Sequence, residues 1–328
     1  MVGCLTGRCV LSGRERVLRC LSGAETDRIP TFFHADAELT ASYSAVLGVS
    51  DLATHFEADM VQLKPTMEKV IFPDFADAED AVQVDSADWP DGAAALDMDA
   101  CVERAQWARG TGRAVCGGAW ASIFTHSRRR MGEERYLLAL YDNPELIERV
   151  VARLTDYFLA VNTRYFDACA QYLDLFYFGS DFGTQLSMFI SPEHYRRFFK
   201  PHMKRLVDHA KGYGLRVMFH TCGAVGPIIG DLAEIGVDIL DPVQVSAAGM
   251  APATLAREFK GKIAFHGGIS TQTTLPFATP ADVRAAVRRT LEVLGPERVI
   301  IGPDQQMIGD IPLENVVAMY EAAREFRP

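Results

Sequence analysis

Two residues that can bind a metal ion stand two positions apart at the end of an apolar run. The run "RVMFH" (residues 216–220) ends in His220, and Cys222 and Gly223 follow after one threonine. In a β-strand, residues two apart point to the same side, so His220 and Cys222 could reach one ion. Imidazole and thiolate are both zinc ligands. A small buried thiol beside a strand-end histidine is the alternative, and the pair alone leaves both open.

A catalytic zinc usually has three protein ligands and one open position. The third ligand would have to come from another strand end. No cysteine follows Cys222, so the candidates are Asp304 and His266, with Asp181 a more distant one. Zinc accepts carboxylate and imidazole as well as thiolate, so a mixed site is chemically allowed.

Eight short apolar runs, separated by helical patterns, predict the framework that positions these residues. The runs are residues 29–33, 59–63, 114–119, 175–178, 216–220, 237–240, 262–266 and 298–302. Continuous apolar runs suit parallel strands that are buried on both faces. Their alternation with helices predicts an α/β fold, a single (β/α)8 TIM barrel. An open doubly wound sheet is the alternative, but no Gly-rich phosphate turn follows the first run.

Three helical segments are marked by their end signals. Residues 143–173 open with an Asn-Pro pair that suits a cap and a first turn. Residues 191–214 open with Ser-Pro-Glu, and Pro201 within them predicts a kink or a restart. Residues 279–295 open with Thr-Pro and end at glycine.

One segment interrupts the alternation of strands and helices. Residues 65–95 fit neither pattern, so we predict a small insertion after the second strand, in the form of a hairpin at the barrel mouth. No repeat, low-complexity tract or linker divides the chain, and we expect one domain over residues 1–328.

Polar residues follow nearly every predicted strand, at the end where such barrels build their active sites. The candidates for catalysis are Asp181, His266 and Asp36. The candidates for substrate binding are His34, Lys64, Trp120, Gln185, Gln244 and Gln305, with Phe124 and Tyr177 as further pocket walls. Each has a structural alternative: Asp36 suits a helix N-cap, Asp241 before Pro242 suits a turn, and His266 suits a buried histidine bonded to the backbone.

The composition narrows the class of protein. The net charge of −10, from 43 acidic and 33 basic residues, argues against general nucleic-acid binding. The basic run 128–130 suits a solvated helix start, or a clamp for an anionic substrate. Seven irregularly spaced cysteines indicate a reducing compartment. No run reaches the ~18 apolar residues of a membrane span, and residues 1–21 lack a signal-peptide pattern. We expect a cytoplasmic protein.

Long motifs in a fixed order carry a family resemblance. They include "FHTCGAVGPIIGDLAEIGVDILDPVQVSAAGM" (219–250), "FHGGISTQTTLPFATPADV" (265–283) and "GPDQQMIGDIPLENVVAMYEAAREF" (302–326). Residues 14–30 and 177–206 extend the similarity over nearly the whole chain. The sequence resembles the uroporphyrinogen decarboxylase superfamily, and this resemblance implies a single (β/α)8 barrel.

The resemblance implies one of two activities. True uroporphyrinogen decarboxylases remove acetate carboxyls from a tetrapyrrole without metal or cofactor, using arginines after the first strand. Here that position reads "FFHADAEL", which has no arginine to clamp the substrate carboxylates. The other branch resembles corrinoid-dependent methyltransferases, which often carry zinc on a His-x-Cys pair and a later cysteine. His220 and Cys222 match that pair, whereas Asp304 in "GPDQQ" stands where the later cysteine is expected.

We therefore expect a methyltransferase that moves a methyl group between a small methylated substrate and a corrinoid protein, with zinc on His220, Cys222 and Asp304. The chain has no Asp-x-His-x-x-Gly attachment motif, so the corrinoid would come only through a separate carrier protein. The first alternative is a metal-free decarboxylase with Asp181 or Asp36 as general acid. The second is a non-enzymatic barrel that presents its pocket to a corrinoid protein. The oligomeric state stays open, with a homodimer among the options.

Overall fold

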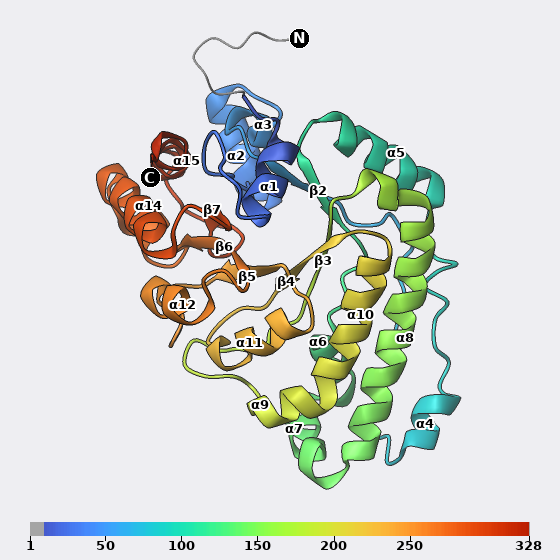
Figure 1. Ribbon diagram of the computed structural model, residues 1–328. Coiled ribbons are helices and arrows are strands. Elements are labelled where there is room, and N and C mark those ends of the chain that lie inside the picture. The colour runs from blue at the N-terminus through green and yellow to red at the C-terminus, as the bar shows by residue number, and fades with distance from the viewer. Residues whose placement is uncertain (1–9, 328) are drawn as a thin grey trace. The chain divides into compact units, whose positions relative to one another are not determined.

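The computed structural model describes residues 10–327, and their fold is α/β (Figure 1). The chain forms two compact units. Unit 1 comprises Met1–Val61, Ala108–Val115 and Ile239–Pro328, and unit 2 comprises Gln62–Trp107 and Cys116–Asp238. Each unit is assembled from separate stretches of the chain, so neither corresponds to a continuous piece of sequence. The single domain over residues 1–328 stays a prediction.

Unit 2 contains parallel strands that are buried along most of their length. β2 (Ala114–Gly117), which begins in unit 1, pairs with β3 (Leu175–Gly179), and β3 pairs with β4 (Arg216–His220). Every residue of β3 is buried, and only the two end residues of β4 are partly exposed. Strands of this kind are covered on both faces, as their continuous apolar runs predict.

The helices of unit 2 confirm two of the predicted segments. α8 (Pro144–Cys169) begins after Asn143, whose side chain accepts a hydrogen bond from the Leu146 N–H. The helix predicted over residues 191–214 is interrupted before Pro201, as expected of a residue that lacks the N–H needed for the helical ladder. It runs as α9 (Pro192–His194), a π-helical turn η2 (Tyr195–Phe199) and α10 (Lys200–Gly212), and α10 lies beside α8 (Figure 1).

Further helices complete unit 2: α4 (Ala81–Ser86), α5 (Met98–Gly110), α6 (Ile123–Met131), α7 (Glu133–Asp142), η1 (Ala170–Tyr172) and α11 (Gly226–Glu234). The last turn of α5 belongs to unit 1.

The hairpin predicted within residues 65–95 is not formed in this described segment. A single antiparallel bridge joins Met67 to Leu96, and the chain between them contains α4, which packs against α8. Prolines within the segment cannot donate to a strand ladder, so two paired strands do not extend from the bridge.

Unit 1 contains the last three strands, which are parallel. They are β5 (Ile239–Val243), β6 (Ala264–Ile269) and β7 (Val299–Pro303). α14 (Pro280–Leu294) and α15 (Leu313–Glu325) pack against each other and against this part of the sheet (Figure 1). α14 starts with a reciprocal cap between Thr279 and Asp282, which confirms the helix predicted over residues 279–295. The remaining helices are α1 (Gly13–Leu21), α2 (Ala37–Leu47), α3 (Leu52–His55), α12 (Pro252–Phe259) and α13 (Thr274–Phe277).

The described residues contain seven of the eight predicted strands, the second being β1 (Met60–Gln62). The first predicted strand is reduced to a parallel bridge between Thr31 and Ile301 of β7. Its ladder is short because Pro30 has no N–H, and because the Thr31 N–H donates to the side chain of Asp59 at 2.8 Å instead of a strand carbonyl. The eight-strand count of the predicted barrel is therefore not confirmed.

Two further sequence predictions can be compared with the described residues. Cysteines 20, 101, 116, 169 and 222 are free thiols, as the irregular spacing predicts, whereas Cys4 and Cys9 lie outside the described residues. The signal-peptide prediction also concerns residues 1–9, which lie outside them. Over residues 10–327, no helix has the length and apolar character needed to cross a membrane.

Candidate metal centre

The exits of two neighbouring strands in unit 2 bring three metal-capable side chains together. Gly179, the last residue of β3, lies beside His220, the last residue of β4. The Ser180 N–H then donates to the His220 carbonyl at 2.9 Å, so the two segments stay side by side beyond the strands. Asp181 follows directly, and its Oδ1 accepts the Cys222 N–H at 3.2 Å. The strand register therefore places Asp181 at the His-x-Cys pair.

Glycines allow this close approach of the two strand exits. A Cβ atom on Gly179 would lie 2.3 Å from the His220 carbonyl oxygen, and one on Gly183 would lie 2.6 Å from the Cys222 carbonyl oxygen. Gly223 has a φ of 83°, which side-chain-bearing residues rarely adopt. The sequence "GSDFG" and the glycine after Cys222 are thus required for the two loops to touch.

The three side chains have the spacing of a metal site. The Nε2 atom of His220 lies 3.2 Å from the Cys222 Sγ atom and 3.5 Å from the Asp181 Oδ1 atom. All three ligand atoms lie within 4.8 Å of one another. Among the described residues, these are the three His, Cys, Asp or Glu side chains that lie close enough together to hold one metal ion. The His220 side chain is 18% exposed and that of Asp181 is 46% exposed, so the cluster is open on the Asp181 side.

Aromatic side chains surround His220. The Tyr177 hydroxyl lies 3.4 Å from His220 Nδ1, on the opposite side of the imidazole from the cluster. The Trp120 ring lies 5.5 Å from the His220 ring and 5.1 Å from the Tyr177 ring, measured between centroids. Phe124, expected as a third wall, is fully buried and stacks on Phe182, which makes it a core residue.

The third ligand predicted from the sequence is Asp304, whereas the structure groups Asp181 with the His–Cys pair. Asp304 belongs to unit 1, where its Oδ1 accepts the Thr271 N–H at 2.8 Å and the Thr271 hydroxyl at 2.9 Å. Sequence order cannot show that the β3 exit pairs with the β4 exit, since that pairing depends on the register of two strands about 40 residues apart.

Two buried groups of unit 1 come from other predicted site residues. Nδ1 of His266 is hydrogen-bonded to Oδ1 of Asp241, so the partner is a carboxylate and not the backbone. Both side chains are buried, and so is Asp304. Burial raises the pKa of the Asp304 carboxyl to about 6, although the two bonds from Thr271 act in the opposite direction. Neither Thr271 nor the Asp241–His266 pairing follows from the sequence, although the polar run after Ile269 is a visible signal.

The other predicted site residues have varied surroundings. Asp36 caps α2, with its Oδ1 accepting the Leu39 N–H at 2.8 Å, which confirms the structural alternative for this residue. The His34 ring stacks on Phe32 with centroids 5.9 Å apart. Lys64 and Gln185 are exposed, Gln305 is partly exposed and Gln244 is buried. Their proposed roles in catalysis or substrate binding stay predictions.

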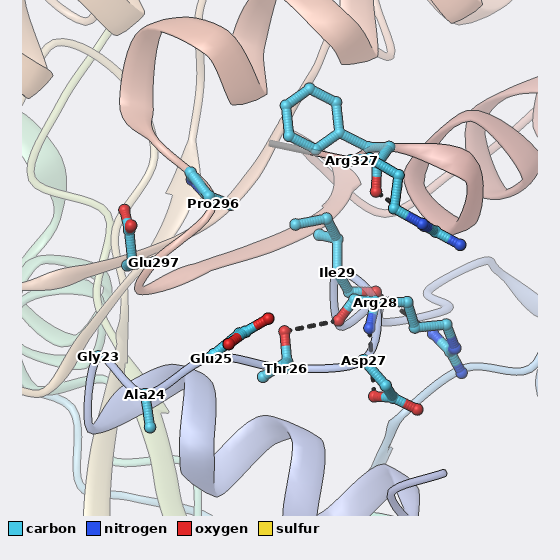
Figure 2. Close-up of a pocket in the computed structure, with 11 residues that line it drawn as sticks. Gly23, Ala24, Glu25, Thr26, Asp27, Arg28, Ile29, Pro296, Glu297 and Arg327 are labelled. Carbon is cyan, nitrogen blue, oxygen red and sulfur yellow. Dashed lines mark hydrogen bonds between the residues drawn. The ribbon is translucent and has the colours of Figure 1, made fainter. Parts of the chain in front are cut away.

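A pocket of about 280 Å³ lies elsewhere in unit 1 (Figure 2). Residues 23–29, Pro296 and Glu297 line it, and the Thr26 hydroxyl donates to the Arg28 carbonyl at 2.8 Å. These residues precede Thr31 and β7, so the pocket lies at the amino ends of strands. Parallel α/β barrels carry their chemistry at the carboxyl ends, and conserve the amino ends for stability. We therefore place no reaction in this pocket.

Parallel strands alternating with helices, with polar side chains at the carboxyl ends of the strands, are typical of barrel-type α/β enzymes. Residues 41–326 match the family model of uroporphyrinogen decarboxylase (URO-D). The chain therefore belongs to the uroporphyrinogen decarboxylase family, as its motifs indicate.

Curated relatives match over shorter stretches. The methionine synthase of Methanothermobacter thermautotrophicus is 27% identical over 101 residues, which cover 30% of this chain and 32% of the relative. The uroporphyrinogen decarboxylase of Thermus thermophilus is 29% identical over 137 residues, which cover 42% of this chain and 38% of the relative. The chain thus spans between about a third and two fifths of the length of these relatives.

Among solved structures, a methyltransferase from Methanosarcina mazei superposes with a TM-score of 0.71. The sequences are 18% identical, and the superposition covers 96% of this chain and 99% of that one. At this identity the likeness shows a shared fold, and that fold extends over nearly the whole chain.

Proposed function

We propose that the chain is a methyltransferase that moves a methyl group between a small methylated substrate and a corrinoid protein, with zinc held by Asp181, His220 and Cys222. The cluster of these three side chains is the observation that carries the proposal. The methyltransferase fold likeness and the match to a methionine synthase support it, because both names refer to methyl transfer.

The donor set fits zinc in number, type and spacing. Ordinary Zn–N, Zn–O and Zn–S lengths in a tetrahedral site put the nitrogen about 3.6 Å from the sulfur and about 3.4 Å from the oxygen. The observed separations from His220 Nε2 are 3.2 Å to Cys222 Sγ and 3.5 Å to Asp181 Oδ1. Three protein donors leave the fourth position for a substrate atom, which is the arrangement of catalytic sites.

The surrounding residues have defined tasks in this proposal. Tyr177 fixes the orientation of the His220 ring by accepting the Nδ1–H, so that Nε2 faces Cys222 and Asp181 as the metal ligand. Trp120 covers the same ring and keeps water away from it. The partly exposed Asp181 marks the open side from which substrate enters. Bound zinc would supply Lewis acidity that lowers the proton affinity of a substrate thiol or other heteroatom.

The corrinoid would be brought by a separate carrier protein, since the chain contains no Asp-x-His-x-x-Gly motif. The match to a uroporphyrinogen decarboxylase supports a second candidate, a metal-free decarboxylase. The segment "FFHADAEL" provides no arginine for a polycarboxylate, so we rank this candidate second.

Elemental analysis of untagged protein tests the proposal. We expect about one zinc per chain in the wild type and in Cys169→Ala, and a loss of zinc in Cys222→Ala. Cys169 is the matched control because it is a buried thiol of the same unit, at the end of α8, and is not one of the three clustered ligands. Zinc-loaded protein should also consume cob(I)alamin when a methylated thiol, amine or ether is supplied. Metal-free wild-type protein that releases carbon dioxide from uroporphyrinogen would establish the second candidate instead.

A further inference from the structure

A groove on the helical surface of unit 1 is formed by α2, α14 and α15, with α15 between the other two helices (Figure 1). Its volume is about 480 Å³. The residues that line it are Val46, Pro280, Arg284, Leu313, Glu314, Val317, Ala318 and Glu321. The groove is thus mainly apolar, with charged side chains among its walls.

Two large apolar side chains at this groove are exposed. Val46 is 71% exposed, and Phe277, three residues before Pro280, is 82% exposed. Asn315 Nδ2 donates to the Ala278 carbonyl at 2.8 Å, which holds the chain next to Phe277 against the first turn of α15. Single exposed apolar residues are ordinary on a monomer, whereas several beside an apolar groove indicate a contact surface.

α14 and α15 run in the same direction along the groove. Asn315, near the start of α15, is bonded to Ala278, which lies just before α14. Arg284, one turn into α14, binds Glu321 and Glu325 near the end of α15. The groove therefore has one end at the starts of both helices and another toward their ends.

The two ends carry opposite charges. Pro280, Arg284 and Arg288 are four residues apart on α14, so Arg288 continues the row that lines the groove toward the end of the helix. Glu314 lies in the first turn of α15, at the other end. Glu314 and Arg288 are both exposed. Arg284, between them, is already held by two carboxylates.

A second copy of the chain fits both the apolar and the charged features. In a two-fold dimer, one surface patch contacts the same patch of the other copy. A two-fold axis that crosses the groove midway exchanges its ends, so Glu314 of each copy faces Arg288 of the other. The same rotation brings the apolar residues of the two copies together. A partner surface of a single charge sign would complement only one end.

We propose that the α2–α14–α15 groove is the interface of a two-fold homodimer, in which Val46 and Phe277 are buried and Glu314 pairs with Arg288 of the second copy. The interface goes beyond the proposed function, because it requires neither zinc nor methyl transfer.

Analytical ultracentrifugation of the untagged full chain over a dilution series tests the interface. We expect a reversible dimer for the wild type. Val46→Asp should raise its dissociation constant about tenfold or more, because it places a charge in the apolar contact. Val82→Asp is the matched control, since Val82 is also 71% exposed but belongs to α4 of unit 2, and it should leave the dimer unchanged.

Charge reversal tests the orientation of the two copies. Glu314→Arg and Arg288→Glu should each weaken the dimer about tenfold, because each brings like charges together across the two-fold axis. The double variant restores opposite charges and should return to within about threefold of the wild type. These variants probe the same surface even if Val46→Asp does not fold.

Three results would overturn the inference. A wild type that stays monomeric at about 100 μM would exclude a second copy and leave a different protein as the occupant. A dimer that Val46→Asp and Val82→Asp weaken equally or not at all would place the contact elsewhere. A double charge variant no tighter than the single variants would refute the pairing. Dimerisation is measured without zinc or substrate, so its failure is distinguishable from failure of the methyltransferase proposal.

Discussion

Replacing Asp304 by asparagine should change how stability depends on pH. Asp304 is fully buried, and burial raises the pKa of its carboxyl from 3.8 to about 6 against the opposing bonds from Thr271. Between these two pH values, the folded chain holds a proton that the unfolded chain has lost. The stabilisation is therefore fully present below pH 3.8 and is lost as the pH rises through 6.

The size of the effect follows from the shift. The full rise in pKa corresponds to about 3 kcal/mol of unfolding free energy. By linkage, about 1.4 kcal/mol of this is lost between pH 5 and pH 8. Asparagine does not titrate, so the variant does not lose this stability. The unfolding free energy of Asp304→Asn minus that of the wild type should therefore be about 1.4 kcal/mol larger at pH 8 than at pH 5. Any constant effect of the substitution cancels in this difference.

Urea unfolding of both proteins at pH 5 and pH 8 measures this quantity. Asp231→Asn is the control. Burial acts to raise the pKa of Asp231, but its bonds from Arg196 and Lys200 outweigh burial and lower that pKa below 3.8. The difference in unfolding free energy between Asp231→Asn and the wild type should be the same at pH 5 and pH 8, because the Asp231 carboxyl stays ionised in both the folded and the unfolded chain. A flat or reversed difference for Asp304→Asn would refute the argument that burial outweighs the Thr271 bonds and raises the pKa of this carboxyl.

Other perturbations test the remaining contacts. Tyr177→Phe should weaken zinc binding about tenfold in a chelator competition, because it removes the hydroxyl that holds His220, and an unchanged affinity in zinc-binding protein would contradict that role. Gly223→Ala should destabilise the fold by about 2 kcal/mol or more in urea unfolding, since its φ is 83° and its Cβ would lie 2.5 Å from the Gly183 backbone. Asp59→Ala should cost about 1–3 kcal/mol of stability, because it removes the acceptor of the buried Thr31 N–H and one of the two carboxylates that bind Arg16, the other being Asp27, and a loss below about 1 kcal/mol would show that the Asp59 contacts are dispensable.

Much of the framework is visible in the sequence, because strand and helix signals are local. Continuous apolar runs identified seven strands that the structure contains, and the Asn143 and Thr279 caps located the starts of α8 and α14. Pro201 indicated the interruption before α10. These signals depend on residues a few positions apart, so chain order is enough to read them.

The first strand shows where local signals fail. Residues 29–33 have the apolar character of a strand, yet the N–H of Thr31 is taken by the Asp59 side chain. Asp59 also binds Arg16 and Arg28, so a buried ion cluster and a single bridge replace a regular ladder. The competition between a carboxylate and a strand carbonyl for one N–H involves residues 28 positions apart, and no periodicity reports it.

The sequence by itself determined that His220 and Cys222 stand two residues apart at the end of an apolar run, which is close enough for both to reach one ion. Only the tertiary structure decided which carboxylate joins them. The register that puts Gly179 beside His220 delivers Asp181 to the pair, while Asp304 is held by Thr271 in unit 1. Register results from packing between distant strands and from glycines that allow backbones to touch, and these are properties of the assembled fold.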